Sequence, residues 1–168
     1  AMIEQYVAHA LSVPREAKVL LIEKTLRMEL GDFVLLGRLD RVDEYPDGTL
    51  EVVDYKTGRS DVREEDVAHD LAMACYQLLV AHHYPDRPVR ASIVAVRTGA
   101  SASAALSDEE RAHFQQDLIE IGKEILHRDY DELVPTYRDL CPECDFLTLC
   151  RKHPEFEEPR VVASPEES

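Results

Sequence analysis

Short apolar runs separated by turn-forming residues mark out the first half of the chain. Apolar residues interleaved with polar ones predict strands at residues 18–29, 33–45 and 49–56. "GD" at residues 31–32 separates the first two runs, and "YPDGT" at residues 45–49 separates the second pair, because proline and glycine favour turns. The pattern therefore predicts a meander of three strands in which a tight turn joins each strand to the next.

The second half of the chain mixes helical periodicity with one further strand. The predicted elements are a helix at residues 64–84, a strand at 90–99, a flexible connector at 99–107 and a helix from 107 to about 129, after a short helix at 2–12 near the start of the chain. Pro85 ends the first long helix, and Ser107 with Glu110 forms a capping box that opens the last one. The order of elements predicts a mixed α/β fold.

The turn at "YPDGT" decides which side chains share a face of the predicted hairpin. Side chains alternate along a strand, so Asp54 and Lys56 point to one face and Tyr55 points to the other. If residues 46–48 form a three-residue loop, paired residue numbers sum to 94 and Asp40 lies directly across from Asp54. A two-residue loop would instead pair Asp40 with Tyr55 and send Asp40 to the opposite face.

Two carboxylates that face each other across a hairpin suggest a cation between them. Their Cβ atoms would lie about 5 Å apart, where like charges repel. Mg²⁺ and Mn²⁺ prefer carboxylate, carbonyl and water oxygens, and a neighbouring lysine can neutralise charge that develops on a phosphate. The set Asp40, Asp54 and Lys56 therefore suits phosphodiester hydrolysis, although an ordinary polar hairpin face would have the same residues.

These motifs resemble the PD-(D/E)XK nuclease superfamily, in particular its RecB-like exonuclease branch, which includes AddB and the CRISPR-associated adaptation exonucleases. The matching residues are "GRLD", which ends at Asp40, and "DYK", which contains Asp54 and Lys56. The resemblance runs from about residue 18 to residue 151. It implies a restriction-endonuclease-like core, with a mixed central β-sheet flanked by helices. It also implies metal binding by Asp40 and Asp54 and a catalytic role for Lys56, with Glu23 in "LLIEK" as a weaker carry-over.

The chain departs from the family pattern in two places. Family members carry an upstream helix with a metal-binding histidine, for which His9 is the candidate here, although a solvent-facing helical histidine would have the same pattern. A Q-x-x-x-Y motif follows the "DYK" strand in the family; Tyr76 matches its tyrosine, but Ala72 stands in place of the glutamine. We therefore expect a nuclease-like domain at residues 1–152, truncated at its N-terminus relative to the family, and an acidic, disordered tail at residues 153–168.

A cysteine motif near the C-terminus forms the second candidate site. Cys141, Cys144 and Cys150 resemble the triplet that, with one upstream cysteine, holds a 4Fe–4S cluster in the RecB-like branch. Thiolates are suitable ligands for iron or zinc. This chain has no cysteine before Cys75, which lies in an apolar helical run and is better explained as a small buried hydrophobic side chain. The cluster is lost, completed by Cys75 or His153, or completed by residues outside this chain.

Charge and composition limit the partners that the chain can bind. The net charge of −15 argues against coating of nucleic acid, because backbone binding depends on lysine and arginine. Five basic residues near the candidate site could form a local phosphate-facing patch or an ordinary mixed surface: Arg38, Arg41, Lys56, Arg59 and Arg63. The excess of acidic residues also suggests a basic partner, such as a helicase or another repair subunit, that helps to hold DNA.

Two functional classes are consistent with these features. The first is a Mg²⁺- or Mn²⁺-dependent DNA nuclease of repair or recombination. The second is a non-catalytic module that keeps the nuclease fold and binds DNA ends or a helicase. No apolar run is long enough for a bilayer, so we expect a protein that does not bind membranes. Four cysteines in a metal-type arrangement, in a chain without an evident signal peptide, indicate a reducing compartment, so we expect a cytoplasmic protein.

Overall fold

The chain forms two compact units. The structure, a computed structural model, describes residues 16–130 and 132–159. The first unit comprises residues 1–126 and the second residues 127–168, and each is described by itself. The helix predicted at residues 2–12, together with His9, lies outside the described residues.

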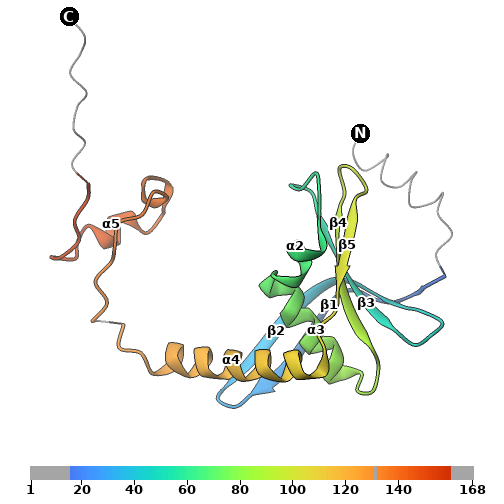
Figure 1. The fold of residues 1–168 in the computed structure, drawn as a ribbon. Helices are drawn as coiled ribbons and strands as arrows, with labels where there is room; N and C mark the ends of the chain where they lie inside the picture. Colours follow the sequence, from blue (N-terminus) through green and yellow to red (C-terminus); the bar gives the residue numbers. More distant parts are fainter. Residues whose placement is uncertain (1–15, 131, 160–168) are drawn as a thin grey trace, which may run out of the picture. The chain divides into compact units, whose positions relative to one another are not determined.

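A five-stranded mixed sheet forms the centre of the first unit (Figure 1). Its strands are β1 (Lys18–Leu30), β2 (Phe33–Glu44), β3 (Leu50–Lys56), β4 (Val89–Ala95) and β5 (Ser101–Ala104), and they lie in this order across the sheet. The pairs are antiparallel, except that β3 and β4 run parallel. A parallel pair needs a crossover connection, which the helices between β3 and β4 provide.

The hairpin between β2 and β3 has the predicted three-residue loop. Val42 pairs with Val52, so paired numbers sum to 94 as predicted. The Tyr45 carbonyl accepts a hydrogen bond from the Gly48 amide (2.9 Å), and Gly48 has a φ of +91°, a conformation that glycine adopts without strain. The alternative of a two-residue loop, which would pair Asp40 with Tyr55, is thereby excluded.

The helix predicted at residues 64–84 is two helices, α2 (Glu64–Ala68) and α3 (Leu71–His83). The single-helix prediction was wrong because Asp70 caps a new helix. Its carboxylate accepts hydrogen bonds from the amides of Ala72 (2.9 Å) and Met73 (3.1 Å), which a helix start leaves without partners.

The last long helix is α4 (Asp108–His127), and its capping box forms as predicted. The Ser107 amide donates to Glu110 Oε2 (2.8 Å), and the Glu110 amide donates to Ser107 Oγ (3.2 Å). Gly122 of α4 lies against the ring of Phe33. This contact places the helix beside the turn between β1 and β2.

The flexible connector predicted at residues 99–107 was wrong, because it contains strand β5. Its residues pair with β4, for example Ala102 with Ile93. The hydroxyl groups of Ser92 and Ser103 also form a hydrogen bond of 2.6 Å across this pair. An alanine- and serine-rich segment has little strand propensity of its own, so pairing with its neighbour determines the strand.

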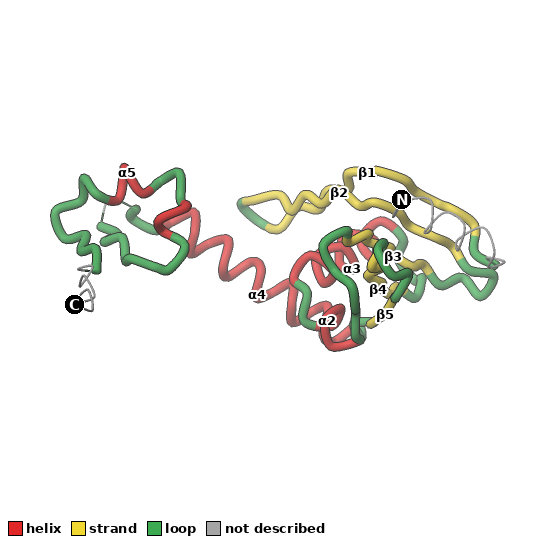
Figure 2. The backbone as a smooth tube through the Cα atoms, turned by 90° about the horizontal axis from the view of Figure 1, so that it is seen from above, coloured by secondary structure: helices red, strands yellow, loops and turns green. Residues whose placement is uncertain are grey.

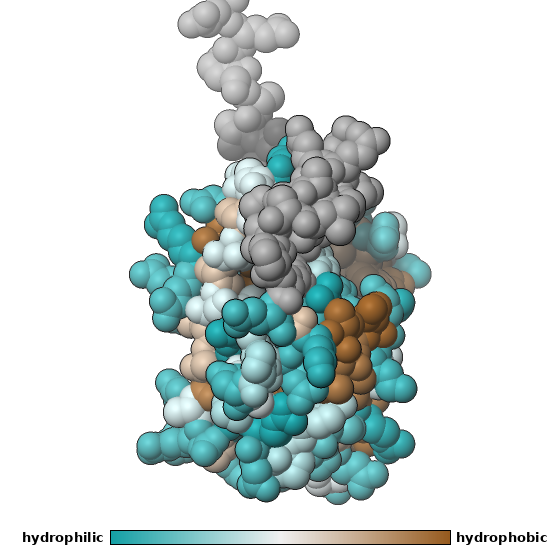
Figure 3. All heavy atoms as spheres, turned by 90° about the vertical axis from the view of Figure 1, so that its right-hand side faces the viewer, coloured by the Kyte–Doolittle hydropathy of each residue, from teal (hydrophilic) through white to brown (hydrophobic). Residues whose placement is uncertain are grey.

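The core lies between the sheet and α3, as Figure 2 shows from above. The fully buried residues Met73 and Leu79 of α3 pack in one cluster with Leu39, Val52 and Ile93 of the sheet. The face shown in Figure 3 is mostly hydrophilic, with a compact apolar patch at its right and smaller apolar spots elsewhere. Within the described part of the chain, no helix combines the length and apolar character that crossing a membrane requires.

The second unit consists mainly of turns. Its regular elements are the 3₁₀ helix η1 (Cys141–Glu143) and the short helix α5 (Leu147–Cys150). None of its described side chains is buried. Arg151 forms an ion pair (2.5 Å) with Glu158, which lies in the predicted acidic tail. Residues 160–168 of that tail lie outside the described residues.

Candidate active site

Asp40 lies where the ladder between β2 and β3 ends. The last pair is Arg41 with Val53, and Asp40 and Asp54 are next in register. The Tyr55 amide donates a hydrogen bond to Asp40 Oδ2 (3.0 Å) instead of to a strand carbonyl. The Asp40 carboxylate is therefore held against the backbone of β3, next to Asp54.

Asp54 is a buried carboxylate with an incomplete set of partners. The residue is 7 % exposed, although charged groups are rarely buried without compensation. Lys56 Nζ lies 2.8 Å from Asp54 Oδ2 as an ion pair. Among the described residues, Oδ2 has no hydrogen-bond partner. Beyond the Lys56 ammonium, this buried carboxylate oxygen thus has room for a ligand.

Lys56 and Tyr76 share the electrostatic environment of the two aspartates. Contact with Asp54 raises the pKa of Lys56, and this effect exceeds the lowering by burial. Burial raises the pKa of Tyr76, and the charges of Asp54 and Asp40 raise it further, whereas Lys56 lowers it. The structure therefore brings Asp40, Asp54 and Lys56 together and places Tyr76 of α3 beside them. Lys56 is a cation at neutral pH.

Gly37 of "GRLD" allows α3 to approach this site. A Cβ atom on Gly37 would lie 2.5 Å from Leu79 Cδ1 and 3.1 Å from Tyr76 Cδ1. These distances are shorter than van der Waals contact, so any larger residue would force the side chains of Leu79 and Tyr76 to shift or the helix to move away. The packing role of Gly37, like the capping role of Asp70, was missed at the level of sequence.

Glu23 does not join the carboxylate pair. Its side chain is 55 % exposed and forms an ion pair with Arg38 (2.6 Å). Its φ of +48° is uncommon for a residue other than glycine and lies in the middle of β1. Glu23 is therefore engaged by Arg38 and has no contact with Asp40 or Asp54 among the interactions of the described residues.

The predicted basic patch carries little free positive charge. Four of its five members form ion pairs with carboxylates: Arg38 with Glu23, Arg41 with Asp43, Lys56 with Asp54, and Arg59 with Asp66. A guanidinium that already pairs with a carboxylate has less attraction for a phosphate. The structure thus favours the reading of an ordinary mixed surface.

The aspartate pair fits a hard divalent cation. Mg²⁺ is commonly held by one or two carboxylates, with waters and substrate phosphates completing its shell. Asp40 and Asp54, whose Oδ2 pairs only with Lys56 among the described residues, supply this minimum. In the described ranges, no group of three or more His, Cys, Asp or Glu side chains is arranged to hold a metal. Substrate or water oxygens would have to complete the coordination.

The cysteine triplet does not fit the iron–sulfur cluster that the sequence resemblance implied. Cys141, Cys144 and Cys150 are free thiols of the second unit, and no metal-binding group of three forms among the described residues. A 4Fe–4S cluster needs four ligands. Cys75, the remaining cysteine, is half-buried on α3, and burial raises the pKa of its thiol, which disfavours the thiolate that a metal requires.

One family pattern and several solved structures are similar to this chain. The sequence pattern of the PD-(D/E)XK nuclease superfamily matches residues 1–151. A crystal structure of a candidate exonuclease from Eubacterium rectale has a TM-score of 0.56 and 15 % sequence identity, and the match covers 96 % of this chain and 63 % of that chain. A crystal structure of SSO0001 has a TM-score of 0.44 and 13 % identity, covering 90 % of this chain and 68 % of that chain. None of the curated proteins compared matches the sequence.

The likeness to the Eubacterium rectale protein is one of fold, and this chain spans less than two thirds of that protein's length. The family match covers most of the 168 residues and includes Asp40, Asp54 and Lys56. The restriction-endonuclease-like core predicted from the sequence is confirmed, and the chain belongs to the PD-(D/E)XK nuclease superfamily.

Proposed function

We propose that the chain is a metal-dependent DNA nuclease of the RecB-like exonuclease type, acting in repair or recombination. The observation that carries this proposal is the buried Oδ2 of Asp54, which has no hydrogen-bond partner among the described residues and lies beside Asp40 and Lys56. Burying a charge in this way costs free energy that a bound cation would offset.

Asp40 and Asp54 would hold one or two Mg²⁺ or Mn²⁺ ions in this site. The cation would lower the pKa of the attacking water and neutralise charge on the scissile phosphate. Asp40 is kept in place by the Tyr55 amide, and Asp54 by its position inside the sheet. Both carboxylates are therefore oriented before any substrate binds.

Lys56 would stabilise the negative charge that builds up on the phosphate. Its pKa is raised, so it carries a proton at neutral pH and acts as an ammonium rather than as a base. When a cation and DNA occupy the site, the Lys56 ammonium would leave Asp54 and contact a phosphate oxygen instead. The attacking water would lose a proton to solvent as its oxygen bonds to phosphorus, the phosphodiester P–O bond would break, and the leaving oxygen would take up a proton from solvent.

DNA binding by this chain would depend on a partner. The net charge is −15, and most basic residues near the site are already paired. A basic helicase or repair subunit would supply the charge that backbone binding needs. All four cysteines are free thiols, which is the state expected in the reducing cytoplasm.

The test is cleavage of DNA labelled at one end, single-stranded and double-stranded, with Mn²⁺ or Mg²⁺ and with a chelator. We expect metal-dependent products that are absent with Asp54→Ala and with Lys56→Ala. Products that shorten progressively from one end would identify an exonuclease. DNA binding without cleavage at high protein concentration would reject the nuclease and favour the non-catalytic module. The observation that favours this alternative is the ion pair of Glu23 with Arg38, because Glu23 then adds no third carboxylate to Asp40 and Asp54.

A further inference from the structure

The face of the β2–β3 hairpin that points away from α3 contains two buried carboxylates. Asp43 and Glu51 pair directly across the two strands and are 2 % and 8 % exposed. The next pair in register, Val42 with Val52, packs in the core on the other face, because side chains alternate along a strand. Like charges in directly opposite positions repel each other, and a buried charge is costly unless it is paired. Each of the two carboxylates therefore needs partners of its own.

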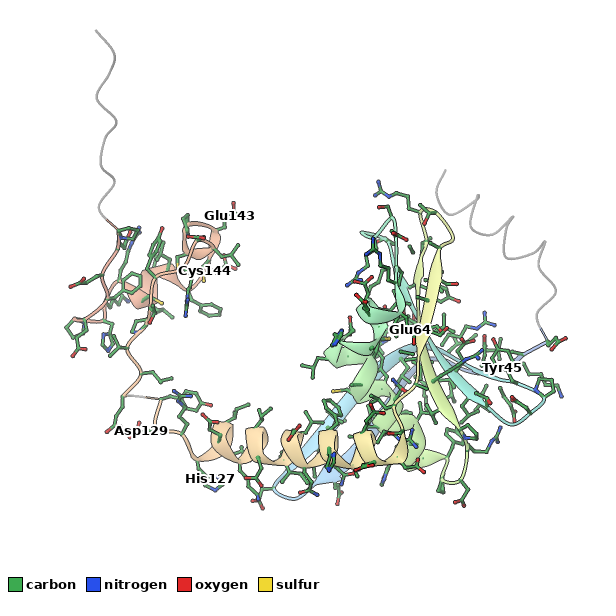
Figure 4. The ribbon with its side chains drawn as sticks, in the orientation of Figure 1. Tyr45, Glu64, His127, Asp129, Glu143 and Cys144 are labelled. Atoms are coloured by element: carbon green, nitrogen blue, oxygen red, sulfur yellow. The ribbon has the colours of Figure 1, made fainter. Side chains whose placement is uncertain are left out.

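Glu51 has its partners near the turn of the hairpin and on β4. Its Oε2 accepts a hydrogen bond from the hydroxyl of Tyr45 (2.6 Å), a residue labelled in Figure 4. Its Oε1 accepts hydrogen bonds from Ser92 Oγ (2.6 Å) and from Arg90 Nε (3.1 Å). The guanidinium of Arg90 also lies over the ring of Tyr45, 4.6 Å from its centroid. This network therefore joins β3 to β4 and to the turn.

Asp43 is paired with Arg41, which lies toward the other end of the hairpin. Arg41 Nε donates to Asp43 Oδ1 (2.6 Å), and the two side chains are 21 % and 3 % exposed. Tyr55 lies two residues after Val53, the register partner of Arg41, so its side chain is on the same face and diagonal to Arg41. Burial lowers the pKa of Arg41, but hydrogen bonds and charge from Asp43 and from Tyr55 raise it more. One guanidinium thus interacts with Asp43 of β2 and with Tyr55 of β3.

Tyr55 is also the residue whose amide holds Asp40, through a hydrogen bond of 3.0 Å to Oδ2. Asp40 lies beyond the last pair of the two strands, Arg41 with Val53, so backbone pairing of β2 with β3 does not fix Asp40 relative to Tyr55. A side-chain contact between Arg41 and Tyr55 can fix it from the other face. The residue next to Asp40 in sequence would then control the distance that its carboxylate depends on.

We propose that Arg41 is a positioning residue of the candidate active site: its guanidinium bridges Asp43 and Tyr55 and thereby keeps the Tyr55 amide on the Asp40 carboxylate. A guanidinium is planar and presents donors in several directions, so it contacts both residues at once, whereas the ammonium of a lysine is a point charge. The role of Arg41 in catalysis rests on the proposed function, but the bridge itself is testable without metal or DNA.

The test is hydrogen exchange of the Tyr55 amide, measured by NMR on the full chain, in Arg41→Lys and in the matched control Arg90→Lys. Both arginines donate Nε to a buried carboxylate of the same face, but the partners of Arg90 are Glu51 and Tyr45. Each lysine keeps a positive charge beside its carboxylate, so neither variant leaves a buried charge without compensation. Relative to the amides of β4, exchange of the Tyr55 amide should be at least about tenfold faster in Arg41→Lys and unchanged in Arg90→Lys. Equal protection in both variants would overturn the proposal.

A second variant tests the bridge without changing a charged residue. Tyr55→Phe removes the hydroxyl and keeps the ion pair of Arg41 with Asp43, so the buried carboxylate stays compensated. Exchange of the amide at residue 55 should be about threefold faster or more in this variant, because one side of the bridge is lost. An exchange rate equal to that of the wild type would show that Arg41 does not act through Tyr55.

Affinity for Mn²⁺ separates positioning from a purely structural role. In titration calorimetry, Arg41→Lys should bind Mn²⁺ about tenfold more weakly than the wild type, because Asp40 is no longer held beside Asp54, whereas Arg90→Lys should bind it equally. Unchanged Mn²⁺ affinity in Arg41→Lys would overturn the positioning role. A wild type that neither binds Mn²⁺ nor cleaves DNA would instead reject the proposed function, and the exchange rates would still decide whether Arg41 holds the Tyr55 amide.

Discussion

Replacement of Gly37 by alanine tests whether the close approach of α3 to β2 stabilises the site. The new Cβ would lie 2.5 Å from Leu79 Cδ1 and 3.1 Å from two ring atoms of Tyr76. Leu79 is fully buried and its core neighbours restrict other rotamers, so the Leu79 side chain must repack or the helix and strand must separate. Overpacking of this kind costs about 1–3 kcal/mol.

A second glycine provides the reference for this substitution. Alanine reduces the conformational freedom of the unfolded chain, which stabilises a protein by about 0.4–1 kcal/mol where the native backbone allows it. Gly58 has no atom within 4 Å of an added Cβ, so Gly58→Ala shows this effect without the clash. The difference between the two variants therefore isolates the packing cost of about 1–3 kcal/mol.

Urea unfolding measures this difference. With a slope of about 2 kcal/mol per molar, Gly37→Ala should unfold at a urea concentration about 0.5–1.5 M lower than Gly58→Ala. Displacement of Tyr76 should also slow DNA cleavage under conditions in which both variants are folded. A Gly37→Ala protein as stable as Gly58→Ala would refute the argument that this glycine allows the helix to approach.

Three further substitutions test single interactions. Lys56→Met should bind Mn²⁺ about twofold to fivefold more tightly in calorimetric titration, because it removes a partly exposed cation from Asp54. The same variant should lose DNA cleavage. Weaker Mn²⁺ binding than in the wild type would contradict this interpretation. Burial raises the pKa of Glu51, but hydrogen bonds from Ser92 and Tyr45 lower it more, so its folded pKa is below its ordinary value. The contribution of the Glu51 carboxylate to stability is therefore present above its unfolded pKa of about 4.3 and is lost as pH falls through its folded pKa. Glu51→Gln should flatten the dependence of the unfolding free energy on pH between about 5 and 3. Asp70→Ala should cost about 0.5–2 kcal/mol in urea unfolding and Asp70→Asn much less, since asparagine can still cap α3; equal losses would show that capping is not the cause.

The hairpin could be predicted from sequence because local chemistry determines it. Pro46, Asp47 and Gly48 fit a three-residue loop, and the loop length fixes the register of the strands. The positions of Asp40 and Asp54 follow from that register. The sequence pattern did not predict that the β2–β3 pairing ends before Asp40, because the hydrogen bond from the Tyr55 amide to Asp40 depends on how the two strands separate.

Elements that depend on distant partners were the ones that sequence reasoning missed. Strand β5 contains only serine and alanine, and its pairing with β4 and the Ser92–Ser103 hydrogen bond are tertiary contacts. The approach of Gly37 to α3 also joins segments that lie far apart in sequence. The break before α3 could have been found, because Asp70 is a favourable capping residue at the start of an apolar run.

The central claim is that the aspartates of the β2–β3 hairpin make this chain a nuclease. Its most direct test is the rate of single-turnover cleavage of end-labelled DNA in Mn²⁺ by the wild type, Asp54→Asn and Asp47→Asn. Asp47 is the matched control, because it lies in the same hairpin, loses the same charge, and as asparagine can still accept its hydrogen bond from the Thr49 amide. We expect Asp54→Asn to lower the rate at least about a hundredfold and Asp47→Asn to leave it unchanged. Equal rates for the wild type and Asp54→Asn would contradict the assignment of the active site to this hairpin.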